Sequence, residues 1–252
     1  MTRVISGVAL AAAALAAILF LPVVALRVLA CAVAALAARE YLEIADTPIR
    51  AVVLVVALCW LTSGTGVPAS HVLLTMALLW VAAEVLISNH SIQQASTGVF
   101  AAVYIGMPLG MLVAVHGLRG WPATLLLIGT VVVSDSMQYY SGRLFGRHPL
   151  APAISPKKTV EGAIGGVICG TAFMTAAGAR VLPFSGFGPL VILGVLVVVL
   201  GICGDLFESR LKRTAGVKDS SSIIPGHGGV LDRIDALLFA AAPFYLYVRN
   251  LT

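Results

Sequence analysis

Charged residues are scarce in this sequence. Only 11% of its 252 residues are Asp, Glu, Lys or Arg, whereas 60% are hydrophobic. The surface of a water-soluble domain carries roughly a quarter or more of charged residues, so this composition excludes an ordinary soluble protein. Long stretches with almost no charge are typical of membrane-spanning helices. The sequence therefore predicts an all-α, polytopic integral membrane protein built as one bundle of helices.

Cysteine is also scarce, and its four copies lie in or beside apolar runs: Cys31, Cys59, Cys169 and Cys203. No two of them have C-x-x-C spacing, and none lies at a zinc-site spacing from a histidine. We interpret them as small residues of the helix core. No internal repeat or low-complexity linker divides the chain.

Apolar segments of helical length fill most of the sequence. We mark nine candidate membrane spans, at residues 4–20, 23–38, 51–66, 71–87, 97–115, 121–139, 161–179, 187–204 and 232–249. Several are shorter than the ~20 residues that a helix needs to cross the hydrocarbon core. Two long polar connections interrupt them, at 140–160 and 205–231. We expect a single membrane domain, 1–252, with N-terminal apolar helices in 1–120 and both polar connections in 121–252.

The N-terminal segment has features of a secretory signal peptide, namely Arg3, an apolar core and Ala-x-Ala triplets. Its apolar character continues past Pro22 to Ala38. That continuation favours a retained pair of helices over a cleaved leader.

Positive charge is distributed unevenly between the two sides of the expected spans. All but four of the 16 Lys and Arg residues fall on the side of the N-terminus, the exceptions being Arg27, Arg119, Arg180 and Arg249. By the positive-inside rule that side is cytoplasmic. All 11 Asp and Glu residues map to the same side or to span ends that face it. We therefore expect a polar site on the cytoplasmic face of the cell membrane, which in a bacterium is the inner membrane.

Three aspartates bracket the second polar connection. Asp205 is expected at the end of one span, and Asp232 and Asp235 at the start of the last one. A spacing of three residues places the latter two on one helix face. As an alternative, both acids serve only the helix N-terminus, where negative charge is favourable. Three carboxylates near one membrane face repel one another, and oxygen ligands of this kind favour Mg²⁺ as the ion that relieves the repulsion.

Cations and glycines lie between these aspartates. Lys212, Arg213 and Lys218 follow Asp205, and attraction to lipid head groups is one explanation for them. The turn PGHGG, residues 225–229, lets backbone amides approach an anion closely, and it leads into a helix N-terminus, which favours phosphate. His227 within it is a phosphate donor, a general acid or base, or a solvated loop histidine.

The first polar connection, 140–160, contains or adjoins residues of similar types. Asp135 precedes it, and SPKKT near its end offers Ser155, Lys157 and Lys158 just before Glu161. Hydroxyls and lysines of this kind suit a phosphate-rich ligand, although a positively charged cytoplasmic loop alone would also contain them. Two such loops on one face favour the phosphate site.

The segment SRLKRTAGVKDSSSIIPGHGGVLDRID, from Ser209 to Asp235, resembles the long signature of the phosphatidate cytidylyltransferase family, also called CDP-diacylglycerol synthases. Every constrained position of that pattern is met. The upstream stretch YYSGRLFGRHPLAPAISPKKTVEG resembles two further blocks of the family. One departure is Gln138, where the family usually has alanine.

The resemblance implies transfer of CMP from CTP to phosphatidic acid in phospholipid biosynthesis, with CDP-diacylglycerol and pyrophosphate as products. It makes 121–252 the catalytic half, with cytoplasmic loops 140–160 and 205–231. It implies Mg²⁺, which K⁺ can accompany, bound by Asp205, Asp232 and Asp235, and it adds Lys212 and Arg213 as catalytic residues. The implied substrate-binding residues are Ser155, Lys157, Lys158, Ser209, Lys218, Asp219, His227, Gly228 and Gly229. The family also suggests a homodimer in the lipid bilayer, with no nucleic acid partner.

Three alternatives stay open. Because of Gln138, one alternative is a cytidylyltransferase that acts on another membrane phosphate, of lysophospholipid or isoprenoid type. A transporter is less favoured, because transporters place polar groups near the bilayer midplane and the middles of these spans lack charge. The intact signature argues against a purely structural membrane protein.

Overall fold

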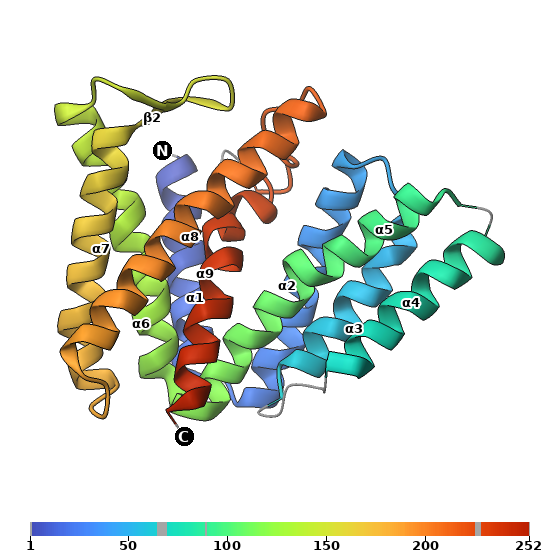
Figure 1. The fold of residues 1–252 in the computed structure, drawn as a ribbon, viewed down its shortest axis with the longest axis horizontal. Coiled ribbons are helices and arrows are strands. Elements are labelled where there is room, and N and C mark those ends of the chain that lie inside the picture. The colour runs from blue at the N-terminus through green and yellow to red at the C-terminus, as the bar shows by residue number, and fades with distance from the viewer. Residues whose placement is uncertain (1, 65–69, 89, 225–227, 252) are drawn as a thin grey trace. The chain divides into compact units, whose positions relative to one another are not determined.

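The computed structural model describes residues 2–64, 70–88, 90–224 and 228–251, with only the helical backbone at 2–6 and 70–72. The chain is made almost entirely of helices (Figure 1), and it divides into two compact units. The first comprises Met1–Gly117 and Asp219–Arg233, and the second comprises Leu118–Lys218 and Ile234–Thr252. The signature segment contributes to both units, since its loop belongs to the first and its flanking helices largely to the second.

The first unit is built from short apolar helices. They are α1 (Thr2–Phe20), α2 (Val23–Ile44), the 3₁₀ turn η1 (Ile49–Ala51), α3 (Val52–Thr62), α4 (Ser70–Leu86), α5 (Ile92–Ala101), the π turn η2 (Ala102–Gly106) and the start of α6 (Met107–Phe145). Pro22 separates α1 from α2, because a proline lacks the backbone donor that a continuing helix needs. A capping box of Ser91 and Gln94 begins α5.

Aromatic and glycine contacts hold this unit together. Tyr41 of α2, Phe100 of α5 and Tyr104 of η2 form a cluster with ring centroids 5.7 to 6.1 Å apart. Gly110 of α6 lies so close to Thr62 of α3 that a Cβ would overlap its hydroxyl. The cluster lies toward the C-terminal end of α2, where Glu40 is next to Tyr41 in the sequence.

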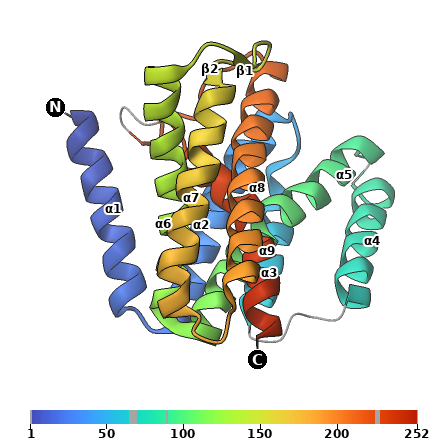
Figure 2. The same cartoon turned by 60° about the vertical axis from the view of Figure 1, so that its left-hand side comes forward.

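The second unit contains the longest helices. They are the remainder of α6, α7 (Val160–Val181), α8 (Phe187–Thr214) and α9 (Leu231–Asn250). Gly120 interrupts α6 with φ 73° and ψ −173°, and Pro122 follows it. A small antiparallel hairpin of β1 (Pro149–Ala151) and β2 (Ser155–Thr159) joins α6 to α7. Figure 2 shows α7 and α8 side by side, with the hairpin at one end of both.

Small residues on α7 permit close helix packing. A Cβ at Gly166 would overlap the side chain of Gln138 on α6, and one at Gly170 would overlap Val198 on α8. Small residues at membrane helix interfaces allow backbones to approach in this way. The side chain of Thr159 accepts a hydrogen bond from Gly162 N at 3.1 Å and so caps α7.

The prediction of a helical protein with membrane-type helices is confirmed in its broad form. Within the described residues, three helical segments are long and apolar enough to cross a membrane: Ile92–Phe145, Val160–Val181 and Phe187–Thr214. Each of the nine expected spans contains a helix, but the fifth and sixth belong to one helical stretch broken at Gly120. The number of nine spans stays a prediction.

Two expected boundaries differ from the structure. The region 140–160 is not a plain loop, because α6 continues to Phe145 and the hairpin follows. The region 205–231 is helical over its first part, because α8 continues through Asp205 to Thr214. At 1.5 Å per residue the 28 residues of α8 extend about 42 Å, more than the roughly 30 Å of a hydrocarbon core.

Candidate active site

The polar end of α8 carries the first residues of the signature. Glu208 is buried and pairs with Lys212, one turn further along the helix, at 2.5 Å. Ser209 Oγ donates to Asp205 Oδ1 at 3.4 Å. Lys212, which we predicted to neutralise a substrate phosphate, is therefore a buried residue with an ion pair inside its own helix.

Asp205 belongs to a group of charged side chains from four elements of the second unit. Asp135 of α6 and Asp235 of α9 both interact electrostatically with Asp205 and with Lys158 of β2. The ammonium of Lys158 forms an ion pair with Asp205 Oδ2. We name these four residues the aspartate–lysine cluster. Its three carboxylates repel one another, and Lys158 offsets part of that repulsion.

Gln138 lies beside this cluster. Its amide nitrogen donates to Asp135 Oδ1 at 3.0 Å and to Ser134 Oγ at 3.2 Å. The residue at which the sequence departs from the family pattern thus contacts an acidic residue of the cluster.

The other predicted cations of the second unit lie near the surface. Arg213 donates to the backbone oxygens of Ile154 and Val217, at 3.4 and 3.1 Å. Lys157 and Lys218 are exposed. Successive side chains of a strand point to opposite faces, so Lys157 and the half-buried Lys158 of β2 face different ways. Ser155 begins the same strand.

In the first unit, the signature loop folds around two carboxylates. Asp232 Oδ2 accepts hydrogen bonds from Ser220 N and Ser220 Oγ, both at 3.0 Å, and from Gly229 N at 2.8 Å. Asp232 therefore stabilises the loop that precedes its own helix. These donors precede α9, which begins at Leu231, so the alternative that Asp232 serves only the helix N-terminus stays a prediction.

The second carboxylate belongs to Glu40 of α2. It accepts hydrogen bonds from Ser220, Ser221, Val230 and Leu231. A Cβ at Gly229 would overlap Ser220 Oγ and Glu40 Oε2. The sequence argument assigned no role to Glu40, and its signal is an acid about one turn before the end of α2.

Gly228 has φ 81°, and a Cβ there would overlap Asp232. The glycines were predicted to let backbone amides approach phosphates. In the structure they also let the chain approach Asp232 and Glu40. Asp219 is exposed at the start of the loop. His227 lies outside the described residues, so its three proposed roles stay predictions.

No set of three or more His, Cys, Asp and Glu side chains in a metal-binding arrangement occurs among the residues with described positions. Asp135, Asp205 and Asp235 interact electrostatically with one another, and the metal-binding roles predicted for Asp205 and Asp235 stay predictions. Asp135 was noted in the sequence only as the acid before the first polar connection. The grouping of Asp232 with Asp205 and Asp235 stays a prediction.

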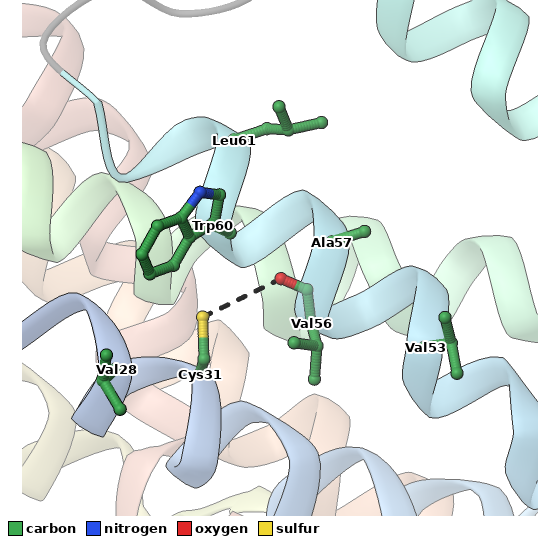
Figure 3. Close-up of a pocket in the computed structure, with 7 residues that line it drawn as sticks. All are labelled: Val28, Cys31, Val53, Val56, Ala57, Trp60 and Leu61. Atoms are coloured by element: carbon green, nitrogen blue, oxygen red, sulfur yellow. Dashed lines mark hydrogen bonds between the residues drawn. The ribbon is translucent and has the colours of Figure 1, made fainter.

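An open groove in the first unit has a different character. It lies between α2 and α3 and is lined by Val28, Cys31, Val53, Val56, Ala57, Trp60 and Leu61. Figure 3 shows Cys31 Sγ directed at the backbone oxygen of Val56, 3.8 Å away. Apolar walls of this kind suit hydrocarbon and not a triphosphate, so the candidate active site is the charged region described above.

Comparison with known proteins decides the family. Residues 1–251 match the sequence profile of the cytidylyltransferase family. The chain belongs to this family. The resemblance found in the signature is thereby confirmed over almost the full length, including the N-terminal helices, which resembled the family only in being apolar.

Several curated proteins are similar to this cytidylyltransferase family member. The phosphatidate cytidylyltransferase of Aquifex aeolicus is 46% identical over 122 residues, which are 48% of this chain and 45% of the relative. The enzyme of that name from Haemophilus influenzae is 50% identical over 126 residues, 46% of this chain and 42% of the relative. The one from Helicobacter pylori strain 26695 is 38% identical over 163 residues, 64% of this chain and 60% of the relative. The chain thus spans about half the length of the curated relatives it matches.

Proposed function

We propose that this protein transfers CMP from CTP to phosphatidic acid and releases CDP-diacylglycerol and pyrophosphate. The observation that carries the proposal is the aspartate–lysine cluster, which α6, α8, α9 and the hairpin assemble from both signature regions. Relatives named phosphatidate cytidylyltransferase support the choice of substrates.

The chemistry follows from the charges of the two substrates. An oxygen of the lipid phosphate attacks the α-phosphorus of CTP and forms a new P–O bond. The bond from the α-phosphorus to the bridging oxygen breaks, and pyrophosphate leaves with the electron pair. The attacking oxygen is already ionised at neutral pH, so a strong general base is not required. The difficulty is to bring two anions together, and catalysis rests on positioning and charge neutralisation.

The residues of this chain suit those two tasks. Lys158 at the cluster and the exposed Lys157, Arg213 and Lys218 supply positive charge for the triphosphate and the lipid phosphate. Lys212 acts indirectly, because its ion pair with Glu208 holds it within α8. At the start of α9 the backbone N–H groups of Gly229, Val230 and Leu231 donate to Asp232 and Glu40, so these three donors act within the protein.

The cluster has the donor chemistry that Mg²⁺ prefers, since Asp135, Asp205 and Asp235 present carboxylate oxygens only. Asp205 and Asp235 would hold the ion, with Asp232 as the third predicted ligand. A bound Mg²⁺ would neutralise charge on the triphosphate and its leaving group. The same oxygen donors suit K⁺ as a second cation.

The membrane setting also fits these substrates. A lipid with two acyl chains keeps its tails in the bilayer while its phosphate reaches the interface. The excess of Lys and Arg on one side of the helices supports a cytoplasmic site at the inner membrane, where CTP is available.

A substrate panel tests the proposal. The purified protein in detergent is given labelled CTP, Mg²⁺ and, in parallel, phosphatidic acid, lysophosphatidic acid or an isoprenoid phosphate. We expect a CDP-lipid when CTP and phosphatidic acid are supplied together. We expect no nucleotide-linked lipid when ATP or GTP replaces CTP, and none after EDTA removes divalent ions. Preferred turnover of an isoprenoid phosphate or a lysophospholipid would replace the proposed acceptor. Solute counterflow without CTP, in the absence of any CDP-lipid, would favour a transporter.

A further inference from the structure

Glu40 is a buried carboxylate in an apolar helix. It lies near the C-terminal end of α2 and is 1% exposed. Burial of a carboxylate costs free energy unless hydrogen bonds compensate for the lost water. Glu43 on the same helix is 45% exposed and forms a surface ion pair with Arg39. The burial therefore distinguishes Glu40 from its neighbour of the same residue type.

Four hydrogen-bond donors to Glu40 come from the signature region. Oε1 accepts from Ser221 Oγ at 2.7 Å and from Val230 N at 2.9 Å. Oε2 accepts from Ser220 Oγ at 2.9 Å and from Leu231 N at 2.8 Å. Both carboxylate oxygens are thus bonded to a segment that lies 180 or more residues further along the chain.

Two of these bonds cap helix α9. The first N–H groups of an α-helix have no acceptor within the helix. Val230 and Leu231 carry apolar side chains and offer no cap of their own. The carboxylate of Glu40 accepts from both backbone N–H groups instead, and its negative charge is favourable at a helix N-terminus.

Glu40 is also linked to Asp232 through shared donors. Ser220 Oγ lies 2.9 Å from Glu40 Oε2 and 3.0 Å from Asp232 Oδ2, and its single proton serves one of them at a time. Gly229 N donates to Asp232, and Gly229 has no room for a Cβ beside Glu40. The position of Asp232 therefore depends on a loop that Glu40 holds.

We propose that Glu40 is a positioning residue, whose carboxylate holds the signature loop and the first turn of α9 in the arrangement that nucleotidyl transfer requires. The proposal rests on the proposed function, because it acts through Asp232 and the loop. Glu40 contacts no reacting atom. Its loss should affect the geometry of the reaction more than the attraction of the two anionic substrates, which the surface cations still supply.

The variant Glu40→Gln tests this, with Glu43→Gln as the matched control on the same helix. Glutamine keeps the size of the side chain, but its NH₂ group cannot accept a hydrogen bond, so two of the four donors lose their acceptor. We expect kcat to fall by roughly 10²-fold, as for a displacement of about 1 Å. We expect KM for CTP and for phosphatidic acid to change by less than about threefold, because uniform binding is retained.

Amide hydrogen exchange supplies a readout independent of activity. In Glu40→Gln, peptides that contain Val230 and Leu231 should exchange faster, while peptides of α7 exchange as in the wild type. Glu43→Gln should change neither kcat nor exchange. A full kcat in Glu40→Gln overturns the proposal, whether or not exchange is faster. A lower kcat with unchanged exchange also overturns it, because the loop is then still held.

Failure of the proposed function gives a different result. The wild type then forms no CDP-lipid at all. Hydrogen exchange in Glu40→Gln still shows whether Glu40 anchors the loop, and exchange equal to that of the wild type would show that it does not. If Glu40→Gln does not fold, Ser221→Ala decides the matter, because it removes one donor and keeps the carboxylate. A several-fold lower kcat with unchanged KM supports the proposal, and an unchanged kcat overturns it.

Discussion

Lys158 of the β1–β2 hairpin forms an ion pair with Asp205 of helix α8. Each residue comes from a different polar connection of the sequence, and the pair brings the two connections into one cluster. The side chain of Lys158 is 21% exposed and that of Asp205 is 33% exposed, while the ammonium nitrogen of Lys158 itself is buried. Residues of the two polar connections thus contact each other directly.

The variant Asp205→Asn should lose CMP transfer by about 10² or more, because the amide removes the charge that interacts with Lys158 and that would bind the proposed divalent ion. Rates of CDP-lipid formation at saturating CTP measure the effect. The matched control is Asp46→Asn, at an exposed position with φ 48° that asparagine also tolerates. Wild-type turnover in Asp205→Asn would exclude Asp205 from the reaction.

Lys158 and Lys157 should differ in their contribution, although they are neighbours. Lys158→Ala leaves three interacting carboxylates without their lysine, and kcat should fall by roughly 10–100-fold. Lys157→Ala removes an exposed charge and should mainly raise KM for CTP by a few-fold. Steady-state kinetics of both variants give the comparison. Equal losses of kcat would show that the ion pair with Asp205 does not matter.

Gly229→Ala should disturb the signature loop. The new methyl group overlaps Ser220 and Glu40, and overpacking of this kind costs about 1–3 kcal/mol. We expect a lower thermal unfolding midpoint in detergent and a strongly reduced rate of transfer. Gly188→Ala is the control, because a Cβ there meets no atom within 4 Å. The same midpoint and rate in both variants would contradict the described packing around Glu40.

The sequence predicted the helices well where apolar residues define them. The cores of α7 and α8 follow the expected spans, and the glycines of α7 lie at helix contacts. The predicted end of α8 was wrong, because the polar residues after Asp205 were interpreted as a loop. In the structure the Glu208–Lys212 pair has the i, i+4 spacing that stabilises a helix, and the helix continues in polar surroundings.

The candidate site was predicted in part. Asp205 and Asp235 were grouped because both flank the signature loop in sequence, and their joint role at a metal site stays a prediction. Glu40 was missed because its partners lie 180 or more residues away, and no local pattern encodes a contact of that separation. Asp135 was seen but given no role, since its neighbours come from α8 and α9.

Gln138→Ala tests whether the departure from the family pattern sets lipid preference. Because the amide of Gln138 donates to Asp135 and Ser134, we expect a change of less than about tenfold in rate with phosphatidic acid. We expect the order of preference among acceptor lipids to stay the same. The assay is the substrate panel run on both proteins. A reversed order of acceptors would assign Gln138 to lipid selection.

The most direct measurement follows the α- and γ-phosphates of CTP separately. The wild-type protein is incubated with phosphatidic acid and CTP labelled at one or the other phosphate, and lipid and aqueous products are separated. Attack at the α-phosphorus predicts that the α label enters the lipid and that the γ label appears in pyrophosphate. The γ label on the lipid, or no label from either, would contradict cytidylyl transfer by this protein.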